Sequence, residues 1–111
     1  MVREYFFKEG CFIQEWHNTE DDEACSIARV RVEVAKITKL HAVKNTMERY
    51  VLLEGMANMT VGDKTWQVGP GDVVVIPPGT PQKIENLGNI DLIFLAICAP
   101  RFLQENYVEL E

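Results

Sequence analysis

The sequence predicts an all-β protein whose antiparallel strands form a sandwich or a barrel. Residues 26–34 alternate strictly between apolar and polar side chains, which is the pattern of a strand with one buried and one wet face. Turn-forming residues interrupt the chain at short intervals, as in many-stranded antiparallel proteins. Helical patterns are scarce: only residues 18–24 and 102–110 could form a turn or two, and we expect both to be loops or edge segments.

Ten strands are expected along the chain. The alternating segment places Ala28, Val30, Val32 and Val34 on its buried face and the arginines between them on its wet face. The expected strands are 3–8, 11–16, 26–34, 37–43, 48–54, 56–61, 64–68, 73–76, 82–86 and 91–98, and the turn signals between the later ones are Gly55, 61–64, 69–72, 77–79 and 87–89. No internal repeat or linker appears, so residues 1–111 are expected to form a single domain.

Composition and charge exclude several classes of function. The chain is 47% hydrophobic and 25% charged, which is ordinary for a globular protein and not for a disordered one. Eleven basic residues against 17 acidic ones give a net charge of −6, and no basic patch is visible, so neither nucleic acid nor an anionic membrane is an expected partner. The longest apolar run, 92–99, is too short to span a membrane, and no secretory segment is visible, so we expect a cytoplasmic protein.

The cysteines predict neither a disulfide framework nor a thiolate zinc site. Cys11, Cys25 and Cys98 are odd in number, widely spaced and without a C-x-x-C motif. We expect all three to be reduced. Cys98 is expected to pack in the core, the alternative being that it lines a cavity together with its strand neighbours.

Two segments carry a family resemblance. The first runs from His41 through Glu48 to Gly55, and the second runs from Gly71 through Pro77 and Gly79 to Asn86. In order and spacing they resemble the two motifs of the cupin superfamily, with motif 1 at about 37–55 and motif 2 at about 71–86. The chain looks most like the small single-domain cupins, some of which are described as mannose-6-phosphate isomerase-like. This resemblance implies a jelly-roll β-barrel of antiparallel strands.

The candidate site departs from the family pattern at two ligand positions. The resemblance would place histidines at 41, 43 and 82 and a glutamate at 48, but the chain has Val43 and Gln82, and Ala35 replaces the leading glycine of motif 1. If the barrel aligns as the family implies, His41, Glu48 and Gln82 converge in its interior as metal ligands. They could hold a divalent ion such as Mn, Fe, Zn or Ni weakly. Without metal, they form a polar cluster that orients an organic ligand against Val43.

Other side chains bear on the same site. Tyr50 lies two positions after Glu48 and is expected either to face the cavity as a hydrogen-bond donor or to pack as a core ring. His17 is expected at the surface or at a loop edge. Arg49 should point away from the side of Glu48, so no cationic clamp for a phosphate is visible.

Three functions remain open from the sequence. The favoured one is a small-molecule-binding barrel in which Val43, Tyr50 and Gln82 contact the ligand. The alternative is a metal-dependent isomerase, lyase or dioxygenase acting on a sugar-like or organic-acid substrate, with Glu48 and Tyr50 as catalytic residues. The third is a vestigial pocket in a protein that acts through its dimer surface. The resemblance also implies a homodimer formed through terminal strands.

Overall fold

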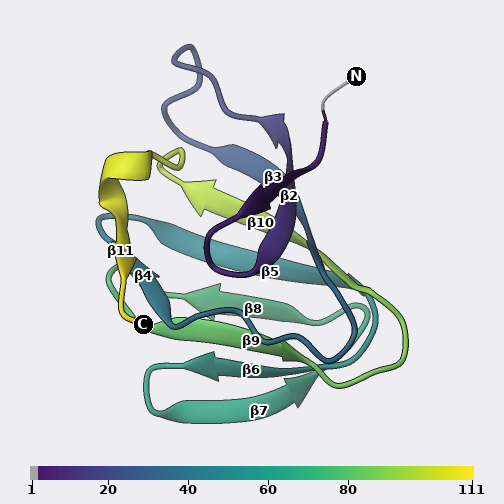
Figure 1. Cartoon of the computed structure of the whole chain (residues 1–111). Helices are drawn as coiled ribbons and strands as arrows, with labels where there is room; N and C mark the ends of the chain where they lie inside the picture. The colour runs from purple at the N-terminus through teal and green to yellow at the C-terminus, as the bar shows by residue number, and fades with distance from the viewer. Residues whose placement is uncertain (1–2) are drawn as a thin grey trace.

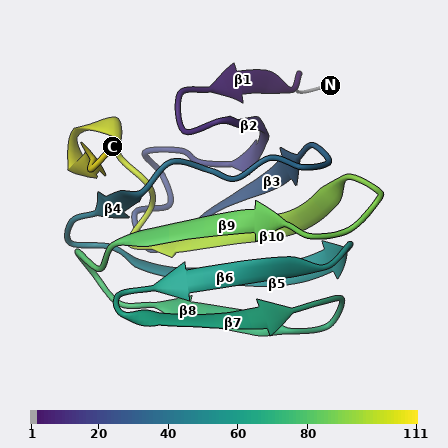
Figure 2. The same cartoon turned by 60° about the horizontal axis from the view of Figure 1, so that its bottom comes forward.

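The computed structural model describes residues 3–111, which form two antiparallel sheets facing each other (Figure 1). The order of strands is β1-β2-β3-β10-β5-β8 in the first sheet and β11-β4-β9-β6-β7 in the second. Figure 2 shows β9 and β6 of the second sheet in front of β10 and β5 of the first. The elements are β1 (Tyr5–Phe7), β2 (Cys11–His17), β3 (Ser26–Val32), β4 (His41–Val43), β5 (Met47–Glu54), β6 (Ala57–Val61), β7 (Lys64–Val68), β8 (Val73–Ile76), β9 (Gln82–Asn86), β10 (Leu92–Ala99), the 3-10 turn η1 (Gln104–Asn106) and β11 (Tyr107–Glu109).

This architecture confirms the predicted all-β jelly roll. The inward side chains of the two sheets interdigitate into one core whose largest fully buried members include Phe94, Leu52 and Met59. The ring of Phe94 packs on that of Tyr50 with centroids 4.4 Å apart, which joins the core to the candidate site. Within residues 3–111, no helix has the length and apolarity that a membrane span needs.

The strand predicted over 26–34 ends two residues early. Its inward positions Val30 and Val32 are buried as expected, but Val34 lies outside the strand and is 44% exposed. The cause is a turn that follows, in which the amide of Lys36 donates to the carbonyl of Glu33 and Ala35 adopts a φ of 65°. Ala35 thus takes the left-handed conformation that glycine adopts without strain, at the position where the motif has its glycine.

The next predicted strand, 37–43, is also shorter than expected. Only His41–Val43 forms β4, and Ile37 makes an isolated bridge to Glu85. The tail predicted as loop or edge contains η1 and then β11, an edge strand that pairs with β4. This pairing places Tyr107 opposite Val43 and brings the C-terminal segment to the end of the barrel that holds the candidate site.

The last residue of motif 2 holds the β9–β10 connection in place. The buried Asn86 side chain donates from Nδ2 to the carbonyls of Val32 (3.0 Å) and Ile90 (2.9 Å). Its Oδ1 accepts from the amide of Gly88 at 2.9 Å. One side chain therefore binds three separate backbone groups. This structural role requires both the NH₂ donor and the carbonyl acceptor of the side-chain amide.

Candidate functional site

A cavity opens at one end of the barrel, where the first sheet meets β4 and β11. About 650 Å³ within it is free of protein atoms, the solvent at its open mouth included. Alternate residues of β1, β2, β3, β5 and β10 line one wall because strand side chains point inward at every second position. The opposite wall comes from β4 and β11.

Four of the five side chains predicted from the two motifs line this cavity, and the fifth, Gln82, is not among its described lining residues. His41, Val43, Glu48 and Tyr50 line it, and all four are buried. Gln82 is fully buried and lies opposite His41 in the pairing of β4 with β9, and its side chain reaches Glu48. The three elements β4, β5 and β9 therefore bring together the polar side chains that the spacing of the motifs singles out.

A first polar network runs through Glu48. The hydroxyl of Tyr50 donates to Oε1 of Gln82 at 2.6 Å, and Nε2 of Gln82 donates to Oε1 of Glu48. The thiol of Cys98 lies 3.6 Å from the other carboxyl oxygen, Oε2. Burial raises the pKa of Glu48, and the contacts with Gln82 and Cys98 act in the opposite direction. Burial, with Glu48 as the second cause, raises the pKa of Tyr50 well above its usual value, so this hydroxyl remains a donor.

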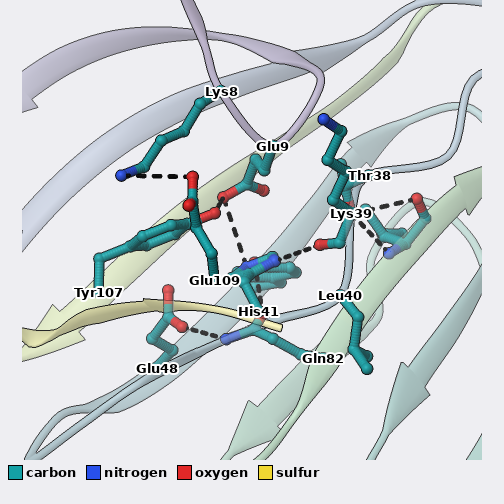
Figure 3. Close-up of polar contacts among 12 residues, drawn as sticks. Lys8, Glu9, Thr38, Lys39, Leu40, His41, Glu48, Gln82, Tyr107 and Glu109 are labelled. Atoms are coloured by element: carbon teal, nitrogen blue, oxygen red, sulfur yellow. Dashed lines mark hydrogen bonds and ion pairs between the residues drawn. The ribbon is translucent and has the colours of Figure 1, made fainter. Parts of the chain in front are cut away.

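A second polar network surrounds His41. Its Nδ1 donates to the carbonyl of Lys39 at 2.7 Å, which leaves Nε2 to face Oε1 of Glu9 at 3.4 Å. The ring of Tyr107 stacks on the imidazole with centroids 5.4 Å apart. Figure 3 shows the Glu9 contact and the Gln82–Glu48 pair on opposite sides of the imidazole ring.

The surroundings of the Glu9–His41 pair favour the neutral form of each group. Burial lowers the pKa of His41 and, with a contribution from Glu48, raises the pKa of Glu9 to about 8. The carbonyl of Lys39 accepts from Nδ1, so in the neutral imidazole the Nε2 lone pair faces the carboxyl of Glu9. Such a pair can exchange a proton with a ligand that enters between them.

Glu9 and Tyr107 belong to the site although the sequence did not single them out as site residues. Glu9 lies in the β1–β2 turn, where its own carbonyl accepts from the amide of Lys39 at 2.8 Å. The hydroxyl of Tyr107 donates to Oε1 of Glu9 at 3.4 Å, which joins the two chain ends over the cavity. A glutamate beside a glycine in a hairpin turn is ordinarily solvated, and no local pattern distinguishes this one.

Three further side chains line the cavity, although the sequence did not place them there or did so only as an alternative. His17 lies at the cavity mouth instead of merely at a loop edge, and its Nε2 is 2.8 Å from Oδ2 of Asp22 in the β2–β3 loop. Cys98 is buried, as predicted for a core residue, but it also lines the cavity, as its alternative allowed. Cys11 lines the cavity beside Glu9. All three cysteines are free.

The arrangement of donors does not fit a divalent ion. In residues 3–111 no three His, Cys, Asp or Glu side chains form a group that could hold a metal. Gln82 turns its amide nitrogen, which is no metal ligand, toward Glu48, and its oxygen already accepts from Tyr50. Val43 offers no donor atom, and the free nitrogen of His41 faces Glu9. We therefore derive no chemical step through a metal at this site.

A barrel of two facing antiparallel sheets, with an imidazole and a carboxyl turned into its interior, defines a jelly-roll protein with a polar internal cavity. Residues 28–98 match the family model described as a cupin domain, and the chain belongs to the cupin family.

Three known proteins illustrate the range of that family. The chain is 36% identical to the uncharacterized protein MJ1618 of Methanocaldococcus jannaschii, over 99% of this chain and 90% of that protein. It is 27% identical to Bacillus subtilis oxalate decarboxylase, a protein with Mn(II) centres, with a TM-score of 0.84 over 97% of this chain but 30% of that one. It shares 15% identity and a TM-score of 0.84 with Pac13 from Streptomyces, a nucleoside dehydratase, over 99% and 85% of the two chains. The last likeness concerns the fold alone.

Proposed function

We propose that this chain binds a small polar organic molecule inside its barrel. The observation that carries the proposal is that two buried polar networks face one open cavity. Burying a carboxyl or an imidazole is unfavourable unless each polar atom has a partner, and apolar residues would fill a structural core more favourably. Two glutamates and a histidine in the same interior are therefore better explained by a ligand than by stability.

The binding contacts follow from the geometry. Tyr50 and Glu48 hold fixed positions because Gln82 bonds both of them. The Nε2 atom of His41 is held less tightly, since 3.4 Å to Glu9 exceeds the usual length of such a hydrogen bond. A ligand hydroxyl or amine at this point would replace a weak contact with a good one, while Val43 would supply apolar surface beside it.

Blocking the cavity tests this proposal. Ala28 lines the cavity from β3, so Ala28→Trp fills the space without removing any polar group. Ala24 is exposed in the β2–β3 loop and outside the cavity lining, so Ala24→Trp is the matched control. We expect polar metabolites that raise the melting temperature of the wild type to act equally on the control and not on Ala28→Trp. Identical responses of the two variants to every such compound would refute an internal binding site.

The second candidate is a metal-dependent isomerase, lyase or dioxygenase, for which the side chains of His41, Glu48 and Gln82 would have to turn toward a common ion. Its support is the 27% identity with an oxalate decarboxylase that has Mn(II) centres. Elemental analysis of protein purified without chelator tests its metal: stoichiometric metal that is lost in His41→Ala would support this candidate. Substoichiometric metal, with no uptake on titration, would remove it.

We also propose that two copies of the chain associate through the β1 edge. Among the strands of residues 3–111, β1 pairs with β2 alone, which leaves its other edge open to pair across a two-fold axis. Phe6 on β1 and Trp16 on β2 are 63% and 52% exposed, so pairing there would cover apolar surface. Sedimentation of the wild type at micromolar concentration should give a dimer, and a monomer would contradict the proposal.

A further inference from the structure

Acidic and aromatic side chains stand out among the residues that line the cavity. Among the described lining residues, Glu9, Glu15 and Glu48 supply carboxyl groups, and no lysine or arginine is present. The aromatic members are Tyr5, Phe7, Tyr50, Phe102 and Tyr107. Lys8 lies over the ring of Tyr107, but its ammonium group pairs with Glu109 (3.6 Å) and does not line the cavity (Figure 3).

The ring nitrogens of the two cavity histidines already face protein oxygens at three positions. The Nδ1 proton of His41 is given to the carbonyl of Lys39, and its Nε2 faces an oxygen of Glu9. The Nε2 of His17 faces Asp22. The side-chain amide nitrogen of Gln82 donates a hydrogen bond to Glu48. A carboxylate or phosphate inside this cavity would therefore find carboxyl oxygens in place of N–H donors.

The surroundings add a field of the same sign. The β2–β3 loop, which follows the lining residues His17 and Asn18, carries Glu20, Asp21, Asp22 and Glu23 in succession, and the chain has a net charge of −6. Arg101 beside Glu23 offsets one of these charges. Negative charge around a low-dielectric cleft concentrates cations at its entrance and repels anions. Aromatic faces inside the cleft stabilise an organic cation that has lost part of its water.

We propose that the cavity binds a small organic cation, a protonated or quaternary amine, between the carboxyl groups of Glu9 and Glu48 and the aromatic walls of Tyr50 and Tyr107. A cation bound beside these carboxyls favours their ionised forms, which then act as its counter-charges. This inference rests on the proposed small-molecule function and specifies the ligand class. A cationic ligand would distinguish this chain from proteins that bind oxalate or sugar phosphates, because both of these compounds are anions.

The test compares probes of matched shape and different charge on the full chain. Choline is the cation, its carbon analogue dimethylbutanol is the neutral probe, and oxalate is the anion, each titrated calorimetrically to about 10 mM, which detects millimolar dissociation constants. We expect choline to bind at least about tenfold more tightly than dimethylbutanol, and oxalate to show no binding. Equal or tighter binding of the neutral or anionic probe, or no choline binding at all, would overturn the cation proposal.

A variant series locates the counter-charge. Glu48→Gln keeps the shape of the side chain and removes its capacity for negative charge, so it should weaken choline binding by at least about tenfold and leave dimethylbutanol unaffected. Glu33→Gln, at an exposed site outside the cavity, should change neither. Unchanged choline binding in Glu48→Gln would contradict the assigned role of Glu48. Binding of dimethylbutanol or oxalate but not choline would preserve the small-molecule function and refute only the charge of its ligand.

Discussion

Replacing Glu9 by glutamine should change how stability depends on pH. In the folded chain the pKa of this carboxyl is raised from 4.5 to about 8, first by burial and second by the charge of Glu48. In the unfolded chain the carboxyl ionises above about pH 4.5. The native state thus has its full stability contribution from this group below pH 4.5 and loses it progressively as the pH rises to 8.

The size of the effect follows from the two pKa values. At about 1.4 kcal/mol for each pH unit, the rise from 4.5 to about 8 corresponds to a loss of up to about 5 kcal/mol by pH 8. Glu9→Gln has no carboxyl to ionise and keeps a similar shape, so its stability relative to the wild type should increase by that amount across the same range.

Urea unfolding at successive pH values from 4.5 to 8 measures the difference directly. The exposed Glu33→Gln variant is the control, and its difference from the wild type should stay flat. Glu48→Gln removes the second cause of the raised pKa of Glu9. In a protein that carries this substitution, the stability difference due to Glu9→Gln should therefore stop growing at a lower pH. A difference between Glu9→Gln and the wild type that does not grow with pH would refute the assignment of a buried, neutral carboxyl at position 9.

Three other changes have expected outcomes. Ala35→Gly should stabilise the fold by about 0.5–1 kcal/mol in urea unfolding, because it relieves a left-handed alanine; a loss of stability would show that the conformation is not strained. Asn86→Ala should destabilise by about 3 kcal/mol because three backbone groups lose their partner, and a loss below about 1 kcal/mol would contradict this. The double variant V43H/Q82H restores the family's histidines and should bind Mn²⁺ at least about tenfold more tightly than the wild type by calorimetry; no gain would show that more than donor identity is missing.

The strands could be predicted where alternation and turn chemistry agree. The strand expected at 26–34 forms over Ser26–Val32, where side chains alternate between a core and a solvent face. The strands expected at 73–76 and 82–86 form with those bounds, and the first of them is a continuous apolar run delimited by turn residues. The alternation of apolar residues continues to Val34, but the chain turns at Ala35. A non-glycine residue in the left-handed region gives no local signal, so the end of the strand could not be placed from sequence.

The site could be predicted only in part. The residues within the motifs could be predicted, and those near the two ends of the chain could not. His41, Val43, Glu48 and Tyr50 occur within one motif, and the two-residue period of strands assigns each to a face. Glu9 and Tyr107 lie outside the segment matched by the family and reach the cavity through the pairing of β11 with β4 and the packing of the first hairpin. Their roles depend on contacts between residues nearly a hundred positions apart, which no local pattern encodes.

The contact between Tyr107 and Glu9 also constrains the order of events during synthesis. The strands of both motifs leave the ribosome well before residue 107, so most of the barrel can pair while the chain is still growing. The wall over His41 forms only after β11 emerges, because the Tyr107–Glu9 contact joins residues 98 positions apart. Until then Glu9 has no tyrosine above it and the imidazole stays open on one side, so a nascent chain stalled before residue 107 carries a barrel with an unfinished pocket.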